Sequence, residues 1–187
     1  MRVAAVGIMG LGYGSFADCE PKFLNMLLNS YPRGVVENSE NQTPKSAWLK
    51  ILGNIGPEEM KKLSIIPSNI PITEPTMGYP SLDTERITLR EELEAVYSEF
   101  SKLIGRGRVV ASINLYEREE SCESLKLVDE YLERMYMDLD SFMFFSPYGE
   151  REGNGRNKYG IYISTLPRPQ EDQTIKLEEI MPLILDL

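Results

Sequence analysis

The amino-acid sequence predicts an α/β domain with a mixed sheet of about four to five strands and helices packed on that sheet. Three observations predict this fold class. Residues 108–146 read as strand, amphipathic helix and strand, residues 2–9 are a continuous apolar run, and residues 159–165 alternate as a strand after a glycine-rich segment. A strand–helix–strand unit gives parallel strands through a right-handed crossover, whereas a short glycine-rich connection gives an antiparallel pair.

The N-terminal third of the chain opens with the predicted central strand. Residues 2–9 (RVAAVGIM) are apolar without alternation, which is typical of a strand that is buried on both faces. A helix is predicted from about Glu20 to Tyr31, because apolar residues recur at helical spacing and Pro32 follows. The remaining elements of this third are a short strand and two short helices, at 35–37, 47–52 and 57–62.

An irregular connection is predicted at 64–80, since four prolines in this stretch prevent regular strand pairing. After it, Thr88 and Glu91 have the spacing of a capping box at the start of a helix that ends at Gly105. The strand–helix–strand unit at 108–146 follows directly. Its helix is expected to begin after Ser121, a residue with a side-chain oxygen suited to an N-cap.

The C-terminal part is expected to complete the same sheet. Residues 149–158 contain three glycines and should connect the strand at 141–146 to an antiparallel strand at 159–165. The apolar residues of 175–187 should pack on the body of the domain. A chain of 187 residues suits one substantial core, so we expect a single domain that spans residues 1–187.

Charge and composition exclude several classes of function. The formal net charge is −9, which argues against a nucleic-acid partner and favours a basic protein partner. The chain has no histidine, and histidine is the commonest general base and metal ligand. We therefore predict no catalytic residues, no metal and no cofactor. No apolar stretch approaches the roughly 20 residues that a membrane span needs, so no membrane span is predicted.

The two cysteines, Cys19 and Cys122, stand far apart and form no C-x-x-C pair. The first interpretation is that both are free thiols of a protein in a reducing, cytoplasmic compartment. The alternative is a secreted protein, because residues 1–17 contain a basic residue, an apolar run and small residues at a cleavage position, as signal peptides do. The sequence leaves open whether the two thiols are free or paired.

A glycine-rich segment follows the first predicted strand. Gly12 and Gly14 begin a G-x-G-x-x-A pattern that ends at Ala17, and Glu37 stands twenty residues further on. In dinucleotide-binding domains such glycines allow the phosphates to approach a helix N-terminus, and an acid at this spacing binds the ribose. These residues, Gly12, Gly14 and Glu37, are the candidate contacts for a small molecule or nucleotide.

Two segments carry a resemblance to a known family. Residues 12–16 (GYGSF) resemble the N-terminal G-F-G-P-F loop of pyroglutamyl peptidases, and residues 162–167 (YISTLP) resemble a Y-x-S-T-L-P segment of that family. The family's Glu-Cys-His triad cannot be assembled here, because histidine is absent and neither cysteine lies in the family's cysteine motif. The resemblance therefore implies a non-catalytic relative.

The function favoured by the sequence is a non-enzymatic protein-interaction or assembly module. Its candidate partner-binding residues are of types enriched at interfaces, and they lie in the glycine-rich loop and the proline-rich connection: Tyr148, Arg151, Arg156 and Tyr79. Acidic residues near the central helix are expected to be a solvated face. Asp138 and Asp140 are the one carboxylate pair among them that warrants a test for acid–base or cation chemistry.

Overall fold

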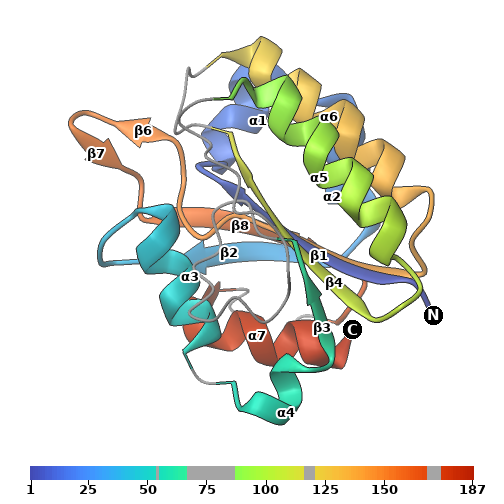
Figure 1. The fold of residues 1–187 in the computed structure, drawn as a ribbon. Helices are drawn as coiled ribbons and strands as arrows, with labels where there is room; N and C mark the ends of the chain where they lie inside the picture. Colours follow the sequence, from blue (N-terminus) through green and yellow to red (C-terminus); the bar gives the residue numbers. More distant parts are fainter. Residues whose placement is uncertain (54, 67–86, 116–120, 168–173) are drawn as a thin grey trace.

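The computed structural model describes residues 1–53, 55–66, 87–115, 121–167 and 174–187. Within these ranges, seven strands form one mixed sheet that has helices on both faces (Figure 1). A further two short strands form a separate hairpin. The α/β class and the mixed sheet are as predicted, and the sheet has more strands than the four to five expected.

The strands of the main sheet are β1 (Val3–Met9), β2 (Arg33–Glu37), β3 (Leu63–Ile65), β4 (Arg108–Asn114), β5 (Ser141–Phe145), β8 (Tyr159–Ser164) and β9 (Thr174–Lys176). The hairpin consists of β6 (Arg151–Glu152) and β7 (Gly155–Arg156). The helices are α1 (Tyr13–Cys19), α2 (Lys22–Ser30), α3 (Pro44–Leu52), α4 (Pro57–Met60), α5 (Leu89–Leu103), α6 (Cys122–Tyr136) and α7 (Leu177–Asp186).

The strand order is β3-β4-β1-β5-β8-β2-β9. β1 pairs in parallel with both β4 and β5, with Val3 aligned to Arg108 on one side and to Ser141 on the other. The sequence-based prediction that these three segments share one sheet is therefore confirmed. β8 pairs antiparallel with β5, as expected, and also with β2, so it runs opposite to the other six strands of the sheet described here.

Two of the additional strands are three residues long. β3 pairs in parallel with β4, and β9 pairs in parallel with β2. Three residues are too few to display a strand period, which is why the sequence did not indicate them. β3 also corrects the predicted irregular connection at 64–80, because its last two residues lie inside that range and are regularly paired. Residues 67–86 lie outside the described part of the chain.

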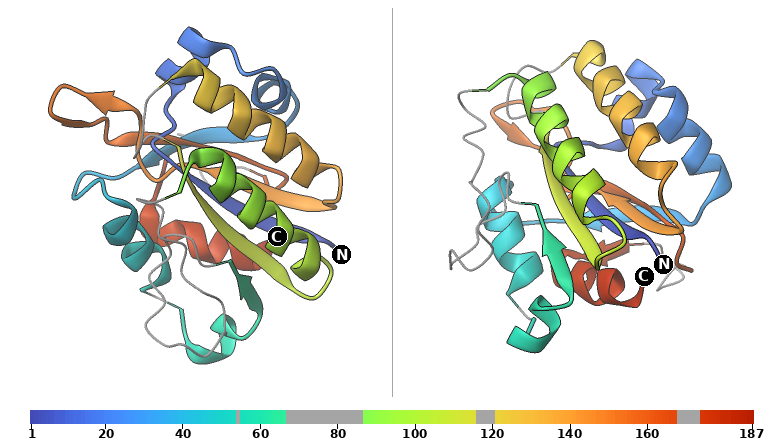
Figure 2. Two further views of the ribbon diagram at one scale, coloured as in Figure 1. Left: turned by 45° about the horizontal axis from the view of Figure 1, so that its top comes forward. Right: turned by 45° about the vertical axis from the view of Figure 1, so that its right-hand side comes forward.

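Side chains from β1 alternate between two cores. Ala4, Val6 and Ile8 are buried beneath α1, α2, α5 and α6, whereas Val3 and Ala5 are buried on the opposite face beneath α3 and α7. Figure 2 shows the same two helical layers from other directions. The continuous apolar run at 2–9 reflects this burial on both faces, as the sequence predicts.

Trp48 anchors α3 to the centre of the sheet. Its indole lies over Gly7 of β1, where an added Cβ would stand 2.8 Å from the ring atom Cζ2. The indole N–H donates to the hydroxyl of Ser112 in β4 at 3.0 Å, so the buried ring has a partner for its polar atom. A larger residue than glycine at position 7 would hold this helix away from the sheet.

Residues 3–16 contribute a strand and the start of a helix to this folded core. β1 pairs with β4 and β5 along most of its length, and α1 follows it with buried Ser15 and Phe16. Cleavage after Ala17, as the signal-peptide interpretation requires, would remove a strand from the interior of the sheet.

Candidate functional site

The carboxyl ends of six strands meet at one edge of the sheet, since these strands run in the same direction. The loop after β1 contains Gly10 and Gly12 and leads into α1, which contains Gly14, and the loop after β5 leads into the β6–β7 hairpin. Ligand sites in open α/β sheets occur at this edge. The candidate ligand contacts and the candidate partner-binding residues therefore lie in segments at or after this edge of the sheet. Tyr79 is the exception, because it lies outside the described residues.

The glycine-rich segment starts α1. Gly12 is the N-cap residue and Gly14 lies in the first turn of a helix of seven residues. A carboxylate of the chain itself lies against both glycines, because a Cβ added at Gly12 or at Gly14 would overlap the oxygens of Glu150. One of those oxygens, Oε2, is buried and accepts no hydrogen bond from the described residues. The two glycines are thus required by the packing of Glu150.

Glu37 lies apart from these glycines. It is the last residue of β2, and β5 and β8 separate β2 from β1 in the sheet. Three strand spacings amount to roughly 14 Å. The Glu37 carboxylate accepts a hydrogen bond from the Ser39 hydroxyl at 3.2 Å and lies 3.5 Å from the Lys158 ammonium. The structure does not bring Gly12, Gly14 and Glu37 together as a dinucleotide-binding domain does.

The β6–β7 hairpin projects beyond the sheet, beside α3 (Figure 1). Its base is closed by two backbone hydrogen bonds, from the Gly149 N–H to the Asn157 carbonyl at 2.8 Å and from the Asn157 N–H to the Glu150 carbonyl at 2.9 Å. Gly153 at the turn has a φ of 58°, a conformation that favours glycine. An added Cβ at Gly153 or Gly155 would meet nothing within 4 Å, so the tip is open.

The arginines predicted to contact a partner lie on this hairpin, but the tyrosine beside them does not share their exposure. Tyr148 is 0% exposed, which contradicts the prediction that the loop presents it to solvent. Its carbonyl accepts a hydrogen bond from the Ser146 hydroxyl, and the Arg156 guanidinium lies 5.8 Å from the centre of its ring. Tyr148 therefore supports the hairpin from the core, whereas Arg151 is exposed and Arg156 is half-buried.

A groove of about 560 Å³ separates the hairpin from the loop that precedes α3. The described residues of its lining supply two guanidinium groups and three side-chain amides and include no carboxylate: Asn41, Gln42, Thr43, Arg151, Gly153, Asn154, Gly155 and Arg156. Guanidinium and amide groups donate hydrogen bonds to carboxylates and to backbone carbonyls. The sequence predicted the two arginines as contact residues. It could not predict that residues 41–43 line the same groove, because that proximity depends on the fold.

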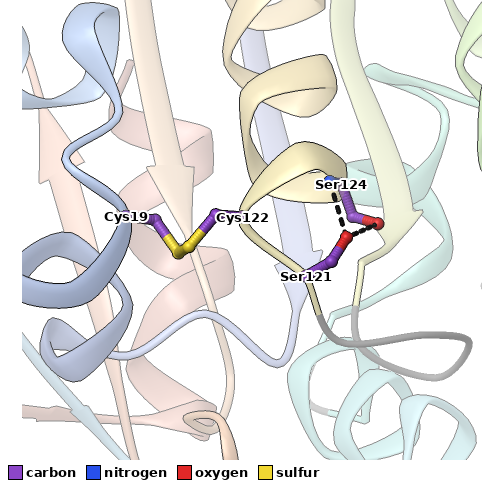
Figure 3. The surroundings of a disulfide bond; sticks show 4 residues. All are labelled: Cys19, Ser121, Cys122 and Ser124. Atoms are coloured by element: carbon purple, nitrogen blue, oxygen red, sulfur yellow. Dashed lines mark hydrogen bonds between the residues drawn. A yellow bond between two sulfur atoms is a disulfide. The ribbon is translucent and has the colours of Figure 1, made fainter.

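The two cysteines form a disulfide between the end of α1 and the first residue of α6 (Figure 3). This finding corrects the interpretation as two free thiols. The sequence could not reveal the pairing, because 103 residues separate the two positions and their proximity follows from the docking of α1 on α6. Beside the bond, the Ser121 hydroxyl caps α6 by accepting the Ser124 N–H at 3.1 Å, as predicted for this residue.

Asp129 joins α6 to the start of α2. Its two carboxylate oxygens accept the N–H groups of Phe23 and Leu24 at 2.9 and 2.8 Å. These N–H groups belong to the first turn of a helix whose own N-cap residue is Pro21, which offers no side-chain cap. Burial raises the pKa of the Asp129 carboxyl above its ordinary value of 3.8, and nearby Glu133 adds to this shift, while the two N–H donors oppose it.

The predicted carboxylate pair, Asp138 and Asp140, contacts Arg2. The Asp140 carboxylate accepts the Arg2 backbone N–H at 2.7 Å, and Asp138 lies 3.6 Å from the Arg2 guanidinium. Both acids therefore contact the residue that precedes β1. Among the described residues, no group of three or more histidine, cysteine or acidic side chains could hold a metal ion.

The comparisons with known proteins identify no family. A scan against models of protein families found no match, and a search of curated proteins found none either. Of the two segments that resemble pyroglutamyl peptidases, the first follows the end of β1, whereas the second starts in β8 beside the end of β5 and runs away from that edge of the sheet. In the described part of the chain, no helix is both long and apolar enough to cross a membrane.

Proposed function

We propose that this protein is a non-enzymatic protein-interaction or assembly module and that the β6–β7 hairpin is its contact surface. The observation that carries the proposal is the hairpin itself, a separate two-stranded sheet outside the main one, with Arg151 and Arg156 lining a groove. Arginine is enriched where proteins recognise one another, because its planar group makes several directed hydrogen bonds. The protein as a whole is negatively charged, which favours a partner that carries a basic surface outside its contact with the hairpin.

Capture of partners from the native source tests this proposal. The purified protein and the variants Arg151→Ala and Arg156→Ala are used as bait, and captured proteins are identified by mass spectrometry. Arg106→Ala is the matched control, because it removes the same charge from an exposed arginine before β4. We expect a partner that the wild-type protein and the control capture and that both hairpin variants lose. A partner held equally by all four proteins would contradict the role of the hairpin.

Tyr148 is unsuitable for this experiment, although the sequence suggested it. A fully buried aromatic residue replaced by alanine costs about 3–5 kcal/mol of stability, so loss of binding would follow from unfolding. Arg151 is exposed and Arg156 is half-buried, and neither belongs to the two hydrophobic cores, so their substitution leaves no cavity in a core.

The alternative proposal is a small-molecule or nucleotide site at Gly12 and Gly14. It has weaker support, because the Glu150 carboxylate lies against both glycines and a bound phosphate would have to displace it. A thermal-shift screen with nucleotides distinguishes the two proposals. A ligand that binds the folded state raises the melting temperature by mass action, and no shift at millimolar nucleotide would rule against this alternative.

A further inference from the structure

A second groove, of about 720 Å³, lies between α6 and the start of α2, on the other side of α1 from the hairpin. Its apolar lining includes the Cys19–Cys122 disulfide, Phe23 and Met26. Met26 is 48% exposed and lies beside the apolar disulfide and Phe23 in the same groove, so these residues form one apolar patch. The thioether of methionine is flexible and polarisable, so it adapts to different apolar partners.

The charged residues of this groove are mainly acidic. Glu20, Glu123, Glu130 and Glu133 are all exposed, and none of them forms an ion pair with another residue that the structure describes. The three on α6 follow one another at intervals of seven and three residues, so they share a face of the helix. Two lysines, at positions 22 and 126, offset part of this charge.

The apolar lining and the acidic residues of the groove indicate what kind of molecule it can bind. A second copy of this chain carries the same net charge of −9 and is repelled, and nucleic acids and anionic membranes are repelled for the same reason. A lysine or arginine side chain gains from the unpaired glutamates, and an apolar side chain gains by covering Met26. We infer that this groove binds a basic segment of a partner protein that carries an apolar side chain between its cationic residues.

This inference rests on the interaction role proposed above and adds the partner's chemistry at a second surface. The probe is a fluorescein-labelled peptide of about twelve residues, roughly three helical turns, in which lysine and leucine alternate in pairs. Binding is followed by fluorescence anisotropy. We expect the lysine peptide to bind and the same peptide with glutamate in place of lysine to show no binding. Raising the salt from about 0.1 to about 0.5 M should weaken binding, because it screens exposed charges.

Two triple variants separate the groove from the general charge of the protein. Glu123→Gln/Glu130→Gln/Glu133→Gln should bind the lysine peptide about tenfold more weakly, if each exposed pair contributes an ordinary amount. The matched control is a triple that removes the same charge from α4, α5 and α7: Glu58→Gln/Glu94→Gln/Glu178→Gln. It should retain binding within about twofold. Equal weakening by both triples would overturn the inference, because it would show attraction to net charge alone.

The apolar part of the groove has its own control. Met26→Gln should weaken binding of the lysine peptide, whereas Met137→Gln, at the exposed far end of α6, should leave it unchanged. Absence of binding to the wild-type protein would also overturn the inference. Arg156→Ala should leave peptide binding unchanged, since Arg156 lines the groove beside the hairpin and not this one. The two proposals can therefore fail separately: a partner lost by the hairpin variants supports the proposed function even where the lysine peptide does not bind.

Discussion

Removal of the Cys19–Cys122 disulfide should lower the free energy of unfolding by about 4–5 kcal/mol. The bond links residues 103 positions apart, so it restricts a large part of the unfolded chain. For a loop of that size the chain-entropy relation gives about 16 cal/mol/K, or about 4.7 kcal/mol near room temperature. Ordinary domains have only about 5–15 kcal/mol in total. The reduced protein should therefore be close to the limit of stability.

Urea unfolding followed by tryptophan fluorescence measures this effect. Trp48 is the single tryptophan of the chain and is fully buried, so its emission reports on the core. Oxidised wild-type protein is compared with reduced wild-type protein and with Cys19→Ser/Cys122→Ser, which should resemble the reduced protein and should not respond to reductant. A difference below about 1 kcal/mol would refute the entropy argument. Alkylation of both cysteines in the native, unreduced protein would refute the disulfide itself.

Four further predictions concern buried contacts. Asp129→Ala should cost about 2–5 kcal/mol, because it leaves two N–H groups of α2 unpaired, and calorimetry measures this loss. Since burial raises the pKa of this carboxyl, the wild-type protein should lose some stability as the pH rises from about 4 through the raised pKa, and Asp129→Asn should lack this component. Gly12→Ala should destabilise the protein less in a Glu150→Ala background than in the wild type, and additive effects in that double-mutant cycle would disprove the contact. Gly160→Ala should be strongly destabilising, because its Cβ would overlap a backbone carbonyl, whereas Gly155→Ala should change the melting temperature little.

The elements that the sequence predicts well are those with local signals. The helix at α5 has its capping box, in which the Thr88 N–H donates to Glu91 and the Glu91 N–H donates to the Thr88 hydroxyl. α6 shows a buried stripe at helical spacing, β1 is apolar over its seven residues, and β4 has apolar residues at alternating positions. In these segments propensity, period and capping agree, so one stretch of sequence is sufficient to predict them.

The features missed depend on distant partners. α1 starts at glycines and has no side-chain cap, so nothing local distinguishes it from a turn. The placement of β8 between β5 and β2 separates Glu37 from Gly12, and no local pattern specifies strand order. Glu150 reaches Gly12 from more than 130 residues away in the chain. The residues that follow Tyr148 have the composition of an exposed loop. Its burial follows from the packing of α3 and α7 beneath the sheet.

The position of β1 has a consequence for synthesis of the chain. This strand precedes its hydrogen-bonding partners in the chain, because Arg108–Asn114 and Ser141–Phe145 are synthesised about 100 residues or more after it. At a translation rate of about 5–20 residues per second, both edges of an apolar strand remain unpaired for several seconds or more. During that interval we expect the apolar segment VAAVGIM to be a point at which nascent chains can aggregate, because both of its edges offer unpaired backbone groups.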